Sequence, residues 1–103
     1  MAKVAMESKI NGKSLKDMAN ETLCGVLEGG YVLTQEAYLE NNQYGEAAYF
    51  AEAVKIGNEI EDGETKAYRV EFKIINEDAE DGSDACNWDE IEDVREIGWT
   101  EIQ

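Results

Sequence analysis

Apolar and polar residues alternate along several stretches of the chain, a period of two that is typical of β-strands with one buried face. The clearest alternation runs through residues 66–76, where one face carries Tyr68, Val70, Phe72 and Ile74. The same pattern predicts four more strands, over residues 3–10, 31–40, 47–57 and 94–102. An alanine-rich helix is the alternative for 47–57. We favour a strand there because Tyr, Phe, Val and Ile prefer strands and Gly57 ends the run.

Residues 15–28 follow a helical period instead. Apolar or small residues recur there at a spacing of three and four, which predicts an amphipathic helix: Leu15, Met18, Ala19, Thr22, Leu23, Val26 and Leu27. Ser14 and Asp17 resemble a capping box at its start. Gly29-Gly30 provides the glycine that commonly follows a helix, although Gly25 inside the segment weakens it.

Turn signals divide these elements. Asn11-Gly12 predicts a turn after the first strand, and Asp62-Gly63 predicts the tip of a hairpin loop over residues 58–64. One helix among hairpin-connected strands indicates a single α+β domain over residues 1–103. We expect an antiparallel sheet of about four to five strands, with the helix packed on one face.

The net charge of −15 changes the functional picture, since 24 acidic residues oppose 9 basic ones. Binding to nucleic acid or to an anionic membrane requires clustered Lys and Arg, so we expect neither. The chain contains no histidine, the commonest general base and metal ligand. We therefore predict a protein that is not an enzyme and binds no cofactor.

The N-terminal residues lack the apolar core of a signal peptide, and no apolar run is long enough to span a bilayer. These features predict a cytoplasmic protein. Cys24 and Cys86 are then expected to be reduced thiols buried as small apolar residues. The sequence indicates no oligomeric state.

Acidic residues concentrate in a segment that we call the acidic segment, residues 77–93. Nine of its 17 residues are Asp or Glu, and none is Lys or Arg. We predict that the acidic segment binds a partner with a basic surface, through Trp88 and its nine carboxylates. These are Glu77, Asp78, Glu80, Asp81, Asp84, Asp89, Glu90, Glu92 and Asp93. The 58–64 hairpin loop is expected to extend this surface through Glu59, Glu61, Asp62 and Glu64, because the two regions flank the same predicted strand.

Other kinds of site fit the acidic segment less well. A calcium-binding EF-hand with Gly82 at its sixth position would place Ala79 and Trp88 where oxygen ligands are required, so that pattern fails. Irregular divalent-metal binding stays an alternative. A carboxylate enzyme would need a desolvated acid in a cleft, and a cysteine nucleophile would lack a histidine base. Trp88 itself has two interpretations, a plug that holds the segment on the sheet or an anchor at an interface.

A short, histidine-free, acidic domain containing EDAEDGSDACNWDEIED resembles the small phage-encoded inhibitors of host defence, the anti-CRISPR and DNA-mimic antirestriction proteins. The resemblance covers size and acidity, without an alignable motif. It implies an inhibitor in the host cytoplasm that blocks a basic nucleic-acid-binding protein, such as a CRISPR effector, a restriction enzyme or a nuclease. Two alternatives are an immunity-type protein that neutralises a basic nuclease toxin, and a divalent-metal-binding or structural module.

Overall fold

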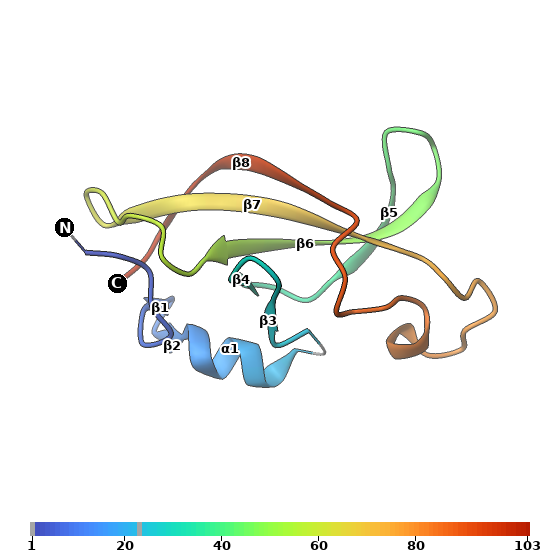
Figure 1. Cartoon of the computed structure of the whole chain (residues 1–103), viewed down its shortest axis with the longest axis horizontal. Coiled ribbons are helices and arrows are strands. Elements are labelled where there is room, and N and C mark those ends of the chain that lie inside the picture. Colours follow the sequence, from blue (N-terminus) through green and yellow to red (C-terminus); the bar gives the residue numbers. More distant parts are fainter. Residues whose placement is uncertain (1, 23) are drawn as a thin grey trace.

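The largest element of the fold is a six-stranded antiparallel sheet (Figure 1). The structure is a computed structural model that describes residues 2–22 and 24–103. The α+β class is therefore confirmed. The described elements, in chain order, are β1 (Lys9–Ile10), β2 (Lys13–Ser14), α1 (Leu15–Glu21), β3 (Val26–Leu27), β4 (Tyr31–Leu33), β5 (Tyr38–Asn41), β6 (Ala47–Lys55), β7 (Glu64–Lys73), the 3₁₀ turn η1 (Gly82–Asp84) and β8 (Asp93–Glu101).

The sheet has the order β3-β4-β6-β7-β8, and β5 pairs with β6 beside the shorter β4. A separate hairpin, β1-β2, forms a second sheet. The expected number of four to five strands is wrong, because the described residues form eight strands in two sheets. Three of the additional strands, β1, β2 and β3, have only two residues each.

The three long strands confirm the period-two prediction. β6, β7 and β8 cover most of the predicted strands 47–57, 66–76 and 94–102, so the alternative of a helix over 47–57 is wrong. On the predicted apolar face of β7, Val70 and Phe72 are buried, whereas Lys73 on the opposite face is exposed. Thr65 and Ala67, at the start of β7, are buried on that opposite face. Between β7 and β8 the register shifts at Ala67/Tyr68. The extra residue on β8 is Ile97, followed by Gly98 at φ 140°, which is the geometry of a β-bulge.

The predicted helix over 15–28 is wrong beyond Glu21, although Ser14 caps its start by accepting a hydrogen bond from the Asp17 N–H (3.2 Å). The Thr22 hydroxyl accepts the Gly25 N–H at 3.2 Å, and Gly25 has φ +60°. That backbone conformation leaves the helix and starts β3. Gly29 and Gly30 form the turn between β3 and β4. Leu23, which we expected on the apolar face of the helix, lies outside the described residues.

The predicted strands over 31–40 and 3–10 are each interrupted. Leu33 pairs with Ala53 and Tyr38 pairs with Phe50. Between these two pairs, the four residues 34–37 lie opposite the two residues 51–52 of β6. The resulting bulge separates β4 from β5. In 3–10, residues 2–4 bond to residues 57–60, and only Lys9–Ile10 forms a strand, because the chain turns after Ala5. The expected alternation of burial is nevertheless present, with Val4, Ser8 and Ile10 buried.

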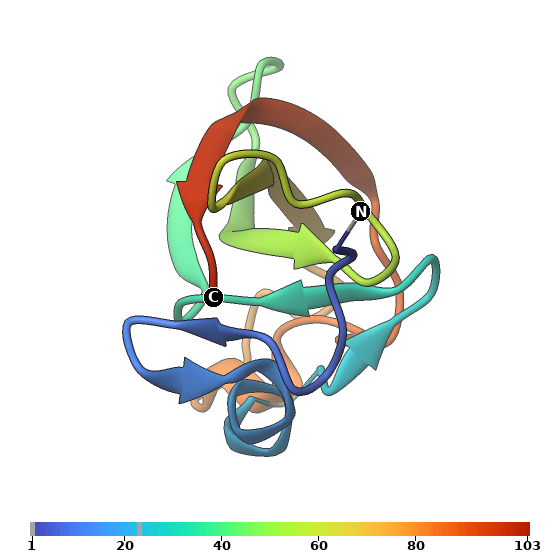
Figure 2. The same ribbon diagram turned by 90° about the vertical axis from the view of Figure 1, so that its left-hand side faces the viewer.

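Two apolar clusters occupy opposite faces of the sheet, since alternate residues of a strand point to opposite sides. Figure 2 shows the strands curving around the interior, with α1 beneath β4. One cluster lies inside the curve and includes Ala53 and Phe72. The other lies between the sheet and α1 and includes Leu15 and Val54. The helix therefore covers only one part of the sheet, and the acidic segment closes the interior at the other end.

Candidate acidic interface

Trp88 fastens the acidic segment to the sheet. Its half-buried ring packs on Phe72, with centroids 4.9 Å apart, and lies edge-on to Tyr49 at 5.4 Å. Its indole Nε1 donates a hydrogen bond of 3.2 Å to the carbonyl oxygen of Gly82, within the same segment. A buried aromatic ring contributes both apolar area and specific ring contacts. Trp88 therefore has the geometry of the plug.

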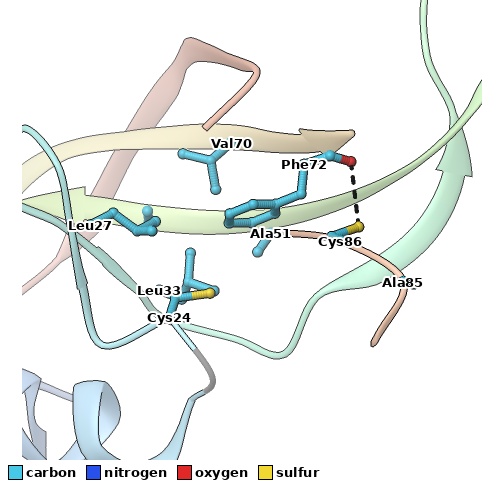
Figure 3. Packing of buried hydrophobic residues seen from close by; sticks show 9 residues of the cluster. Cys24, Leu27, Leu33, Ala51, Val70, Phe72, Ala85 and Cys86 are labelled. Atoms are coloured by element: carbon cyan, nitrogen blue, oxygen red, sulfur yellow. Dashed lines mark hydrogen bonds between the residues drawn. The ribbon is translucent and has the colours of Figure 1, made fainter. Parts of the chain in front are cut away.

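Ala85 and Cys86, both buried, add a second attachment. The carbonyl oxygen of Ala85 accepts hydrogen bonds from the amides of Ile75 (2.8 Å) and Asn76 (3.2 Å), and Cys86 forms a β-bridge with Ile74. Figure 3 shows Cys86 beside Phe72, and the Cys86 sulfur lies 4.0 Å from the carbonyl oxygen of Phe72. The middle of the acidic segment is thus bonded to the chain that precedes it.

The remaining turns of the segment are closed by short polar side chains. The Asp81 carboxylate accepts the Ser83 N–H at 3.0 Å and caps η1. The side-chain oxygen of Asn87 accepts the Asp89 N–H at 3.3 Å, and the Glu92 amide bonds to the Glu71 carbonyl oxygen at 2.8 Å. The two side-chain bonds and the backbone bond from Glu92 to β7 satisfy backbone groups that an irregular segment would otherwise leave to water.

All nine acidic side chains of the segment are exposed. Among the described residues, Asp93 is the one member with an ion pair, to Arg95 at 3.3 Å. The other eight carboxylates face solvent with no ion-pair partner among residues 2–22 and 24–103. The nine acids predicted from the sequence are thus exposed on a backbone held by Trp88, Ala85 and Cys86.

The 58–64 hairpin loop does not join this surface. Asp62 and Gly63 both have positive φ (52° and 77°), which confirms the predicted tip of the hairpin. Glu59, Glu61, Asp62 and Glu64 are exposed. However, the loop and the acidic segment lie at opposite ends of the 46 Å long axis (Figure 1). Between them, the outer face of β7 carries half-buried Arg69 and exposed Lys73, so these acids form a separate group.

The cysteines are free thiols in the interior. Burial, the Asp89 carboxylate and the Cys86 thiol raise the pKa of Cys24 from the ordinary 9.0 to about 11. Burial also raises the pKa of Cys86. Both groups are neutral near pH 7 and lack the low pKa of a cysteine nucleophile.

The nine carboxylates of the acidic segment are all exposed to solvent. Within residues 2–22 and 24–103, no three His, Cys, Asp or Glu side chains are grouped closely enough to hold a metal ion. The described part of the chain likewise contains no helix long and apolar enough to cross a bilayer.

A groove of about 920 Å³ lies beside the acidic segment, between the β5–β6 turn and the two ends of the segment. It adds Glu46 and Glu71 to the acids predicted from the sequence. The signal in the sequence that could have located this groove is Tyr44, an aromatic residue within the polar turn over residues 42–45, where a turn alone requires none. Glu46 follows that turn directly, whereas Glu71 belongs to the exposed face of β7.

Comparison with protein-family models, curated proteins and solved structures finds no match for the chain. Its function must therefore be inferred from the geometry of its own surface.

Proposed function

We propose that this protein is a non-enzymatic inhibitor whose acidic segment occupies the nucleic-acid-binding surface of a basic protein. The resemblance to anti-CRISPR and antirestriction proteins implies a CRISPR effector, a restriction enzyme or a nuclease as the class of target. Host cytoplasm is the corresponding location.

One observation carries the proposal: nine exposed carboxylates stand on a segment whose backbone is attached to the sheet. Duplex DNA presents one negative charge per about 1.7 Å of helix axis, and proteins that bind it line their surface with Lys and Arg. A segment whose backbone is already ordered loses less conformational freedom on binding such a surface, which favours affinity. A flexible acidic tail would lack this advantage.

The charge also favours rapid and selective association. Opposite potentials steer two proteins together and raise the association rate at low salt. Eight of the nine carboxylates have no cationic partner among the described residues, so no ion pair in that part of the chain neutralises their charge. Binding to a basic protein is expected to weaken steeply as salt increases.

The test is inhibition of a DNA-cleaving effector by charge-reversal variants. Glu80→Lys, Asp84→Lys and Glu90→Lys together form the segment variant; Asp81 is left intact because it caps η1. The control variant, Glu7→Lys, Glu28→Lys and Glu36→Lys, makes the same change in charge at exposed positions outside the segment.

We expect the segment variant to lose inhibition at least about tenfold and the control variant to retain most of it. Equal losses in both variants would show that net charge, not this surface, is responsible. A target whose nuclease is a toxin of the same cell would support the immunity-type alternative instead. Failure to bind any basic nucleic-acid-binding protein would contradict the proposal.

A further inference from the structure

We infer that the groove between the β5–β6 turn and the acidic segment binds an extended, arginine-containing segment of the partner protein. This inference rests on the proposed function and specifies which part of the partner is recognised. The occupant is a protruding loop or tail rather than a rigid flat surface, because the binding site is recessed.

The dimensions of the groove suit a peptide. Its volume of about 920 Å³ lies near the upper end of the range for pockets that bind ligands, about 300–1,000 Å³. One wall is the turn between β5 and β6, whose shape is set by Asn42: its side-chain oxygen accepts the amides of Tyr44 (2.9 Å) and Glu46 (3.0 Å). The opposite wall comes from the two ends of the acidic segment, at Glu77 and Glu92.

The charge of the groove identifies a cationic occupant. Five carboxylates line it against a single basic residue, Lys73. Two of the five are already engaged, since Glu71 accepts a hydrogen bond from Asn42 (3.4 Å) and Asp93 pairs with Arg95. Glu46, Glu77 and Glu92 have no ion-pair partner within the described part of the chain. These three carboxylates remain available to cations of another molecule.

The apolar residues of the groove favour arginine over a simple ammonium group. Leu39 and Tyr44 line it while remaining 59% and 76% exposed. Exposed apolar residues gathered at one site commonly mark an interaction surface. The aliphatic stem of arginine can cover them while its guanidinium faces the carboxylates. The planar guanidinium also stacks on aromatic rings such as that of Tyr44.

Two other surfaces of the protein give weaker support for a binding site. The outer edge of β8 exposes Ile97 and Trp99, but the bulge at Ile97 twists that edge and disfavours pairing with another strand. A smaller cavity of about 260 Å³ contains Arg69 and Arg95. Each of these arginines is already paired with a carboxylate, Glu40 and Asp93 respectively.

The inference is tested with a fluorescein-labelled peptide of alternating arginine and serine, titrated with the protein at about 0.15 M NaCl, where charges more than about 8 Å apart are largely screened. Fluorescence polarisation gives the affinity, and amide chemical shifts locate the site. The groove variant carries Glu46→Lys, Glu77→Lys and Glu92→Lys. The segment variant of the preceding experiment is its matched control, with the same change in charge in the same region.

We expect saturable binding, with shifts centred on residues 42–46, and about a tenfold loss of affinity in the groove variant against less than about threefold in the segment variant. Tyr44→Ala should weaken binding and Tyr44→Phe should preserve it, because stacking requires the ring and not the hydroxyl. A lysine–serine peptide should bind less tightly than the arginine peptide.

Equal losses in the groove and segment variants, or shifts spread over the whole acidic segment, would overturn the groove inference. Inhibition of the effector by an acidic surface could then still hold. Conversely, a peptide that binds the groove of a protein without inhibitory activity would overturn the proposed function alone. The two failures are therefore distinguishable.

Discussion

Trp88 is the residue on which the position of the acidic segment most depends. Replacing it with alanine removes the contacts with Phe72 and Tyr49 and the hydrogen bond to Gly82. We expect Trp88→Ala to lower the free energy of unfolding by about 3 kcal/mol. Trp88→Phe keeps a ring in place and loses the hydrogen bond, a cost of about 1 kcal/mol. Urea denaturation measures both changes.

Hydrogen exchange separates a local effect from a global one. The amides of Ile75 and Asn76 bond to Ala85, which Trp88 holds near the sheet. These two amides should exchange faster with solvent in Trp88→Ala. Amides within β6 should lose no more protection than the measured decrease in the free energy of global unfolding accounts for. Unchanged protection at Ile75 would contradict the role of Trp88 as the plug.

The buried thiol of Cys24 makes stability dependent on pH in the alkaline range. Its pKa is about 11 in the folded protein and 9.0 at its ordinary value. The folded state therefore keeps its proton where the unfolded state has lost it. The associated stability is fully present below about pH 9 and is lost as pH rises from about 9 to about 11.

Comparison with Cys24→Ala isolates this contribution from the titration of tyrosine and lysine. The difference in urea midpoint between the two proteins should narrow or reverse between about pH 8 and pH 11. Iodoacetamide should also modify both cysteines slowly at about pH 8 until the protein is unfolded, since the thiolate is the reactive form. Rapid alkylation of the native protein would contradict the burial of these thiols.

At the scale of elements, the break between α1 and β3 depends on Gly25. Its φ of +60° costs a residue with a side chain about 1–2 kcal/mol, although space around it is open. Gly25→Ala should therefore destabilise the protein by that amount. Gly82→Ala is the matched control: its φ is not positive, and the added Cβ would lie 3.7 Å from the Tyr49 hydroxyl, an ordinary contact. Thermal denaturation should distinguish them, and equal effects would contradict the backbone argument.

The same region shows where sequence patterns lose information. Period two identified β6, β7 and β8 because each is nine or ten residues long, enough for an apolar pattern to be recognised. The helical period over 15–28 was ambiguous after Glu21, since Val26 and Leu27 also fit a short strand with one buried residue. The positive φ of Gly25 depends on the pairing of β3 with β4, which no local pattern reveals. The bulge between Leu33 and Tyr38 has the same non-local origin.

The candidate interface was predictable to a similar extent. Exposure of the nine carboxylates follows from their charge, because an unpaired buried carboxylate is costly. Both interpretations of Trp88 followed from its residue type, and its contacts favour the plug. The groove could not be predicted, since it requires the β5–β6 turn to lie beside Glu77 and Glu92. The separation of the 58–64 loop was also missed: the length of β7 places its two flanking loops at opposite ends of the molecule.

At the scale of the whole molecule, negative charge opposes folding. A net charge of −15 on 103 residues creates self-repulsion that salt can screen. The segment variant replaces three acids by lysines and raises the net charge by six, from −15 to −9. We expect it to be more stable than the natural protein by about 1 kcal/mol at low salt, with a weaker dependence of stability on salt.

This expected gain separates function from folding. Under the proposed function, the acidic segment carries charge that the fold alone would do better without, as stability–function trade-offs predict. The segment variant should therefore unfold at a higher urea concentration than the unmodified protein, while inhibiting its target less. The urea measurement is made at about 0.01 M NaCl, where the Debye length is about 30 Å and charges within that distance still repel each other. A variant that lost stability together with inhibition would show that these carboxylates support the fold. The acidic segment would then be part of the structure rather than its binding surface.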